Sequence, residues 1–189
     1  MDRRLEDGLR KGKTDAFERL FELYADSLLR LGYALLSNAA EAEDAVQDAL
    51  VGFIEALRNN RFRGGNGAVS AYLRRSVRNR CIDRMRRSGE MPFSLLEDDA
   101  PLNDSRVAPI TPSSVLDEKR FRKAIEIAIR KLPDAQRAVI VLRMMEEYSY
   151  QQIADELHIS IDHVKNLLGR ARQKLRRELK PFVYEVGRE

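Results

Sequence analysis

Hydrophobic residues recur at helical spacing along almost the whole chain, and no useful length of sequence alternates as a β-strand would. One stripe crosses residues 17–35, and Asn38 interrupts the pattern. A second follows over about 41–57, and a third over about 68–87. The pattern predicts an all-α protein with these residues facing inward: Phe17, Leu20, Phe21, Tyr24, Leu28, Leu31 and Leu35; Ala42, Ala45, Val46, Ala49, Leu50, Phe53 and Leu57; Val69, Leu73, Val77, Cys81 and Met85.

The stretch 88–117 breaks the helical pattern. It contains four prolines and six acidic residues against a single arginine, Arg106, which is typical of an extended, flexible acidic linker. Helical spacing resumes near Val115 and continues to the end, with Pro133 in the first turn of a helix. We therefore expect two small helical domains, at about 10–88 and 115–182, joined by a linker at 89–114.

Charge is sorted along the chain although the net charge is only +4. Residues 15–57 carry nine acidic side chains against two arginines. Residues 68–87 carry seven arginines against Asp83, and residues 161–180 carry seven basic side chains against two acidic ones. Such sorting favours separate surfaces for partners of opposite charge, although solvated helix faces would produce the same pattern.

Several classes of protein are disfavoured by composition. Two histidines and one cysteine are too few for a metal site, and we expect Cys81 to be a buried, inert thiol. No apolar run reaches membrane-spanning length, and the N-terminal residues lack the apolar core of a signal peptide. The simplest expectation is a cytoplasmic protein without cofactor or metal.

The stretch "SYQQIADELHISIDHVKNLLGRARQKLRREL", residues 149–179, predicts a short helix, a tight turn and a long basic helix. Ser149 and Gln152 have the spacing of a capping box. With "HIS" as the turn, the second helix would bury Ile161, Val164, Leu168, Ala171 and Leu175. This arrangement favours a DNA-binding helix-turn-helix over an antiparallel helix pair with a charged exterior. The face left open carries Asp162, His163, Lys165, Asn166, Gly169, Arg170 and Gln173.

Two long segments make the interpretation specific. The stretch that begins "LPDAQRAVIVLRMMEEYSYQQIADELHIS" resembles region 4 of bacterial sigma factors. The upstream stretch "DAFERLFELYADSLLRLGYALLSNAAEAEDAVQDALVGFIEAL", with the loop and basic helix after it, resembles region 2. Two regions in this order without region 3 are similar to the extracytoplasmic-function (ECF, group IV) sigma factors. The resemblance implies a non-enzymatic factor that binds core RNA polymerase and directs promoter-specific transcription initiation.

The resemblance also implies two surfaces in region 2. The segment "AEDAVQDAL" would dock on the clamp helices of the polymerase β′ subunit through Glu43, Asp44, Gln47 and Asp48. The loop "RFRGGNGAV" would capture a flipped base of the −10 element, with Phe62 stacking and Asn66 reading its edge. Asp83 is expected to pair with Arg87 rather than contact a base. The expected −10 residues are Phe62, Arg63, Asn66, Arg74, Arg75, Arg78, Asn79, Arg84 and Arg87.

In region 4 the resemblance implies recognition of the −35 element and contact with the β flap. His158 stands in the turn where the family commonly has Gly, and a left-handed conformation there would cost a histidine roughly 1 kcal/mol. Leu167 and Gly169 replace residues that are often Arg and His, which leaves the preferred −35 sequence open. An anti-sigma factor is implied as a further partner. The expected −35 residues are Arg137, Asp162, His163, Lys165, Asn166, Arg170, Gln173 and Lys174.

Two other functions compete with this interpretation. A two-domain helix-turn-helix regulator would bind operator DNA without polymerase, but it leaves the N-terminal basic helix and glycine-rich loop unexplained. A helical adaptor that binds only proteins leaves both basic faces unexplained. An enzyme is the weakest hypothesis, because the chain has no glycine-rich phosphate loop, no nucleophile motif and no clustered His, Cys and Asp.

Overall fold

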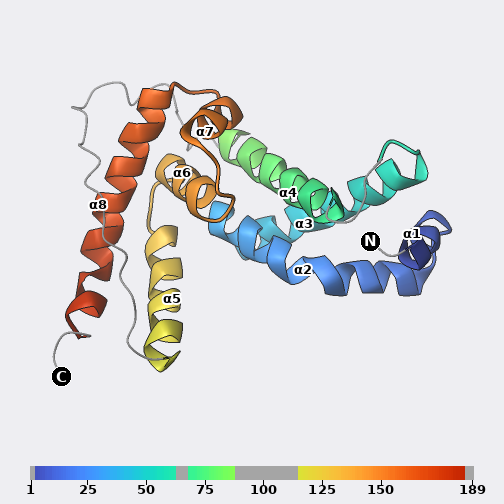
Figure 1. The fold of residues 1–189 in the computed structure, drawn as a ribbon, viewed down its shortest axis with the longest axis horizontal. Coiled ribbons are helices and arrows are strands. Elements are labelled where there is room, and N and C mark those ends of the chain that lie inside the picture. Colours follow the sequence, from blue (N-terminus) through green and yellow to red (C-terminus); the bar gives the residue numbers. More distant parts are fainter. Residues whose placement is uncertain (1–2, 63–67, 88–114, 186–189) are drawn as a thin grey trace. The chain divides into compact units, whose positions relative to one another are not determined.

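The computed structural model describes residues 3–62, 68–87 and 115–185, and within them the chain forms helices and no strand (Figure 1). The chain divides into two compact units, Met1–Ser88 and Gly89–Glu189. This arrangement confirms the expected all-α class. The acidic linker predicted at 89–114 lies outside the described residues.

The N-terminal unit is built on three packed helices, α2 (Thr14–Leu36), α3 (Ala39–Arg58) and α4 (Ala68–Arg87). Asn38 interrupts the hydrophobic pattern because it is the N-cap of α3, where its side chain accepts the backbone N–H of Glu41. Every residue expected to face inward on α3 and α4 is buried. The hydrophobic stripes of these two helices therefore predict the core correctly.

The prediction of inward-facing residues on α2 is wrong at one position, Phe21. Leu20, Leu28, Leu31 and Leu35 are buried as expected, but Phe21 remains 51% exposed. One residue along a helix turns a side chain by about 100°, so Phe21 lies beside the buried line that Leu20 belongs to. Phe21 therefore contributes to the surface.

A further helix, α1 (Arg3–Arg10), precedes these three and packs against α2 and α3. The hydrophobic pattern did not predict it, because only Leu5 and Leu9 mark its apolar side. Leu9 is fully buried, and Gly12 just beyond the helix has a φ of 72°. The leucine pair at i and i+4 followed by a glycine was the available signal.

The C-terminal unit contains α5 (Val115–Arg130), α6 (Asp134–Met144), α7 (Tyr150–Leu157) and α8 (Ile161–Glu185). Ile140, Leu142, Ile153 and Val164 are among its buried core residues. Pro133 is the N-cap of α6, one position before the first helical turn in which we expected it. Packing of α5 on α8 forms a second buried cluster of Ala124, Ala128 and Leu179.

Candidate nucleic-acid and protein interfaces

The predicted capping box and turn are both present in the C-terminal unit. The Ser149 hydroxyl accepts the backbone N–H of Gln152 at 3.2 Å, and the Gln152 side chain accepts the backbone N–H of Ser149 at 2.8 Å. His158 ends α7 in the left-handed region, with φ 56° and ψ 47°. Ser160 directly precedes α8, and its hydroxyl accepts the backbone N–H of His163. These contacts define a helix-turn-helix between residues 149 and 185.

The exposed side of α8 contains most of the residues expected to contact −35 DNA. Val164, Leu168 and Ala171 are buried as predicted. Asp162 and Lys165 pair with each other at 2.8 Å, and this hydrogen bond raises the pKa of Lys165. Asp162, Lys165 and Gln173 are exposed, while His163, Asn166, Arg170 and Lys174 are half-buried.

Two positions in this unit differ from expectation. Arg137 is only 5% exposed, and its guanidinium bonds to the Leu132 carbonyl oxygen at 2.9 Å and to Asp134. These bonds stabilise the start of α6 and keep the Arg137 guanidinium inside the unit. Its burial argues against a DNA contact by Arg137. Leu167 is buried in the core of the unit, so a leucine at this position removes no polar group from the exposed face.

In the N-terminal unit, the four residues expected to dock on polymerase form one exposed face of α3: Glu43, Asp44, Gln47 and Asp48. A groove of about 600 Å³ adjoins this face between α2 and α3. Phe21 and Val51, which is 56% exposed, line the groove together with Gln47 and Glu18. Exposed apolar side chains bordered by polar ones are typical of protein-binding surfaces. The hydrophobic pattern did not predict this groove, because helical periodicity placed Phe21 in the core.

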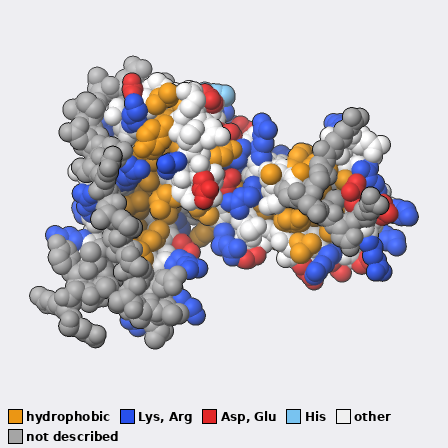
Figure 2. Space-filling view, viewed as in Figure 1, with side chains coloured by type: hydrophobic (Ala, Val, Ile, Leu, Met, Phe, Trp, Pro, Cys, Tyr) orange, Lys and Arg blue, Asp and Glu red, His pale blue; other side chains and the backbone are white. Residues whose placement is uncertain are grey.

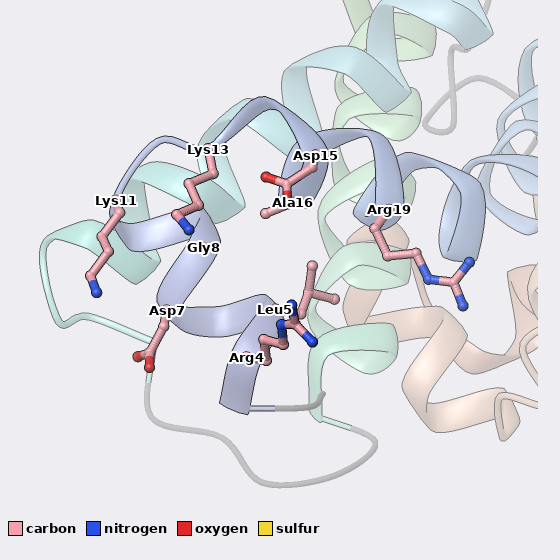
Figure 3. Close-up of a pocket in the computed structure, with 9 residues that line it drawn as sticks. All are labelled: Arg4, Leu5, Asp7, Gly8, Lys11, Lys13, Asp15, Ala16 and Arg19. Atoms are coloured by element: carbon pink, nitrogen blue, oxygen red, sulfur yellow. The ribbon is translucent and has the colours of Figure 1, made fainter.

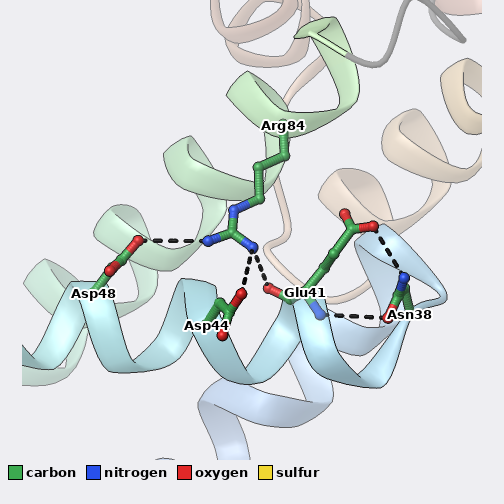
Figure 4. A network of polar contacts seen from close by, with 5 residues as sticks. All are labelled: Asn38, Glu41, Asp44, Asp48 and Arg84. Carbon is green, nitrogen blue, oxygen red and sulfur yellow. Dashed lines mark hydrogen bonds and ion pairs between the residues drawn. The ribbon is translucent and has the colours of Figure 1, made fainter.

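Arg84, expected to contact −10 DNA, instead joins α4 to the acidic face of α3 (Figure 4). Its Nη1 donates to the Glu41 carbonyl oxygen at 2.9 Å and lies 3.7 Å from Asp44 Oδ2. Its Nη2 lies 3.5 Å from Asp48 Oδ2. Arg84 of the basic helix α4 is therefore paired with the expected docking face of α3 in this conformation.

Other residues expected to bind −10 DNA are divided between surface and interior. Arg78 is only 3% exposed, which argues against its forming part of a cationic track along DNA. Asp83 pairs with Arg86 at 3.8 Å, not with Arg87 as predicted from the i+4 spacing. Arg74 is half-buried, whereas Arg75, Asn79 and Arg87 are exposed. Arg63 and Asn66 lie outside the described residues.

Phe62 belongs to a cluster of three aromatic rings. Its ring centre lies 5.1 Å from that of Phe53 and 5.6 Å from that of Tyr72, in edge-to-face geometry with both. Phe53 is fully buried, whereas Tyr72 is 36% exposed. Packing of this kind holds Phe62 at the end of α3. Tyr72 offers more open surface for stacking than the half-buried Phe62.

Among the described residues seen in Figure 2, charged side chains of both signs are spread over the surface, with hydrophobic side chains exposed between them. Among the described residues, no helix is long and apolar enough to cross a membrane. The same residues include no cluster of three or more His, Cys, Asp or Glu side chains that could hold a metal ion.

Comparisons with known proteins agree with the two-region interpretation. Residues 20–90 match the family described as sigma-70 region 2, and residues 122–175 match the family described as sigma-70 region 4. The chain is 32% identical over 186 residues to the ECF RNA polymerase sigma factor SigW of Bacillus subtilis, covering 91% of this chain and 93% of that protein. It is 33% identical to the ECF RNA polymerase sigma factor SigM of Mycobacterium tuberculosis, covering 89% of this chain and 79% of that protein.

Proposed function

Because this chain belongs to the ECF RNA polymerase sigma factors of the sigma-70 family, which direct transcription initiation, we propose that its two units divide the work between them. The N-terminal unit, in about residues 10–88, binds core polymerase and opens the −10 element. The C-terminal unit, in about 115–182, binds the −35 element as duplex. The residues between them act as the linker.

The helix-turn-helix of α7 and α8 is the observation that carries the proposal for the C-terminal unit. Its capping box and turn set the start of α8, whose exposed side carries polar and basic groups. Residues early in such a helix contact base edges, and later cations contact phosphates. We assign Asp162, His163, Lys165 and Asn166 to the bases, and Arg170, Gln173 and Lys174 to the backbone.

For the N-terminal unit, the exposed acidic face of α3 and the adjoining apolar groove support docking on the β′ clamp helices. An acidic rim beside apolar surface suits a partner helix with basic and apolar side chains. The C-terminal unit would contact the β flap, and an anti-sigma factor would cover these surfaces when the protein is held inactive. RNA synthesis itself belongs to the polymerase, so we assign this chain no catalytic residue and place it in the cytoplasm.

The −10 function is assigned to the region where α3 ends and α4 begins. Opening a promoter unstacks bases at a cost of a few kcal/mol, which contacts to the unstacked base must offset. Phe62 and Tyr72 lie together there, and Asn66 remains the side chain proposed to read a base edge. Arg74, Arg75, Asn79 and Arg87 supply further contacts to the separated strand.

Run-off transcription with core polymerase across a promoter library tests this function. A sigma factor will produce transcripts whose yield depends on both the −10 and −35 sequences. An operator-binding regulator will bind duplex DNA but start no transcript with core polymerase alone, and that result would reject the proposal.

Permanganate footprinting of promoter melting tests the −10 assignment. The Asn66→Ala and Phe62→Ala variants should reduce melting and change preference at one −10 position, because one good base contact is worth about 1–3 kcal/mol. Binding of the −35 duplex should be nearly unchanged. Equal yield and ranking across −10 variants for wild type and both variants would show that these residues do not read the base.

A further inference from the structure

Two arginines cross between the N-terminal helix and the end of α3. Arg10, the last residue of α1, donates from Nη1 to the Leu57 carbonyl oxygen and to Asn60 Oδ1 at 2.7 Å. Arg58, the last residue of α3, reaches back so that its Nε donates to the Leu9 carbonyl oxygen at 3.4 Å. The two helix ends are thus joined by contacts in both directions.

Glu6 holds the Arg10 side chain in place. Its Oε1 accepts from Arg10 Nε at 3.2 Å and from Nη2 at 2.9 Å. Both side chains are about one-third exposed, so water screens this pair only in part. A guanidinium held along one edge by a carboxylate presents its remaining donors in a fixed direction, which here is toward Leu57 and Asn60.

Helix α1 packs closely against α2. A Cβ added to Gly8 would lie 2.7 Å from the Cβ of Ala16, so α1 approaches α2 more closely than any side chain at position 8 would allow. Gly8 and Ala16 lie beside each other where the two helices meet (Figure 3). Leu9 is fully buried next to this contact. Arg10 therefore extends from a fixed support.

Asn60 is the residue on which the chain turns away from α3. Its φ is 53°, in the left-handed region, which asparagine tolerates better than most residues. Just beyond it, the amides of Arg61 and Phe62 both donate to the Ala56 carbonyl oxygen, at 2.8 and 3.1 Å. The conformation of Asn60 thus decides where Phe62 lies, and its side chain is the group that Arg10 holds.

We propose that Arg10 is a positioning residue for promoter opening. By holding Leu57 and Asn60, it sets the course of residues 59–62 and seats Phe62 against Tyr72. The inference rests on the proposed −10 function of these aromatic residues. Arg10 acts through Asn60 and makes no contact with DNA. Helix α1 thereby contributes to promoter opening through Arg10.

The first test examines the contact itself, without DNA. In the full-length chain, Arg10→Gln should speed amide hydrogen exchange at Arg61 and Phe62 by roughly tenfold, equivalent to about 1.4 kcal/mol. The Arg19→Gln control removes another paired arginine, one that bonds Glu22 on the surface of α2, and should leave both amides unchanged. Unchanged exchange in Arg10→Gln would overturn the proposed positioning, whatever the −10 function proves to be.

The second test uses Asn60 to separate positioning from stability. Asn60→Gly removes the Asn60 side chain that accepts from Arg10, while the Leu57 carbonyl oxygen remains as an acceptor. Glycine suits the left-handed conformation, so the unit should not be destabilised by strain. Asn60→Asp keeps the acceptor. Arg10→Gln and Asn60→Gly should each reduce permanganate-detected melting by roughly tenfold on a promoter series and alter the ranking of −10 variants. Asn60→Asp should leave melting at nearly the wild-type level.

Three results distinguish the possible failures. Amide hydrogen exchange in the cores of α3 and α4 must stay at the wild-type level in all variants, since a general loss of folding of the N-terminal unit would speed it. Faster exchange in Arg10→Gln with wild-type melting and ranking would overturn the role in promoter opening. If the Phe62→Ala variant also opens the promoter normally, the proposed −10 function of the aromatic residues fails as well. If the Phe62→Ala variant is defective in promoter opening, only the role of Arg10 fails.

Discussion

At position 158 the backbone takes a conformation that an L side chain resists. His158 has φ 56° and ψ 47° and links α7 to α8 through the turn of the helix-turn-helix. We predicted this cost from the absence of a glycine, and the structure confirms the left-handed geometry. The strain is tolerated because the capping box and the buried residues of both helices determine the turn.

The His158→Gly variant should therefore stabilise the C-terminal unit by about 1 kcal/mol, because glycine adopts positive φ without a Cβ clash. Urea unfolding followed by a probe in α8 measures the change. Glu156→Gly is a matched control in the last turn of α7, where the backbone is helical and the same replacement should destabilise by up to about 1 kcal/mol. A loss of stability in His158→Gly would show that the histidine side chain contributes more than its backbone strain costs.

Cys81 illustrates a second effect of local environment. It is fully buried in α4, and burial raises the pKa of its thiol from 9.0 to about 12. The folded protein therefore retains the thiol proton at a pH where the unfolded chain loses it. Its contribution to the free energy of unfolding should be fully present below pH 9 and be lost as pH rises from about 9 to about 12.

Urea unfolding of wild type and Cys81→Ala at several pH values from roughly 8 to 11, below the pKa of the folded thiol, measures this dependence. The difference in unfolding free energy between the two proteins should shrink as pH increases, while other titrating groups cancel. Parallel pH curves would mean that the thiol ionises equally in both states.

At the scale of elements, helix α8 combines a buried side with an exposed basic one. If Arg170 and Lys174 contact phosphates, replacing each with Gln should lower the salt slope of −35 duplex binding by roughly one unit per lost contact. Arg30→Gln, on α2 in the other unit, removes one charge and should leave the slope unchanged. Fluorescence titration of the full-length chain at several salt concentrations gives the slope. A slope unaffected in Arg170→Gln and Lys174→Gln would place both residues away from the DNA backbone.

Helix α4 shows how neighbouring elements change the use of a side chain. Its seven arginines resemble one basic surface in the sequence. Packing of α4 against α2 and α3 buries Arg78 and brings Arg84 to Asp44 and Asp48. Two of the arginines expected to bind DNA therefore have roles within the fold in this conformation.

At the scale of the whole molecule, function requires association with core polymerase. Asp44→Ala and Asp48→Lys should weaken that association, by roughly tenfold for the charge reversal, because complementary charges across an interface are lost. Gln47→Ala should weaken it because a polar contact is lost. Gln47→Ala is the most direct of the three, since it leaves the Arg84 contacts in place. Equilibrium binding of labelled protein to core polymerase measures the effect.

The matched control for this surface is Asp26→Ala, which removes an exposed acid paired with Arg30 on α2. It should bind core polymerase as wild type does. Equal binding by all four variants would exclude the acidic face of α3 as the docking surface.

The sequence by itself determined the helical class, the core stripes of α3 and α4, the capping box and the turn at His158. Each depends on residues only a few positions apart, through periodicity, capping geometry or backbone preference. It also determined the family, because the segments resembling region 2 and region 4 follow one another in a single chain. The short helix α1 was missed because two leucines give too weak a periodic signal.

Only the tertiary structure decided which charged and aromatic side chains remain at the surface. Arg78 and Arg84 stand on the same helix as exposed arginines. Arg84 pairs with Asp48 on α3, 36 positions away, and Arg78 is buried where α4 packs against α2 and α3. Phe21 differs from Leu20 by a single position and both border the groove between α2 and α3, yet Leu20 is 1% exposed and Phe21 is 51% exposed. The contact of Arg10 with Asn60 joins residues 50 positions apart. Such contacts arise from packing between distant segments, so no local pattern of residues encodes them.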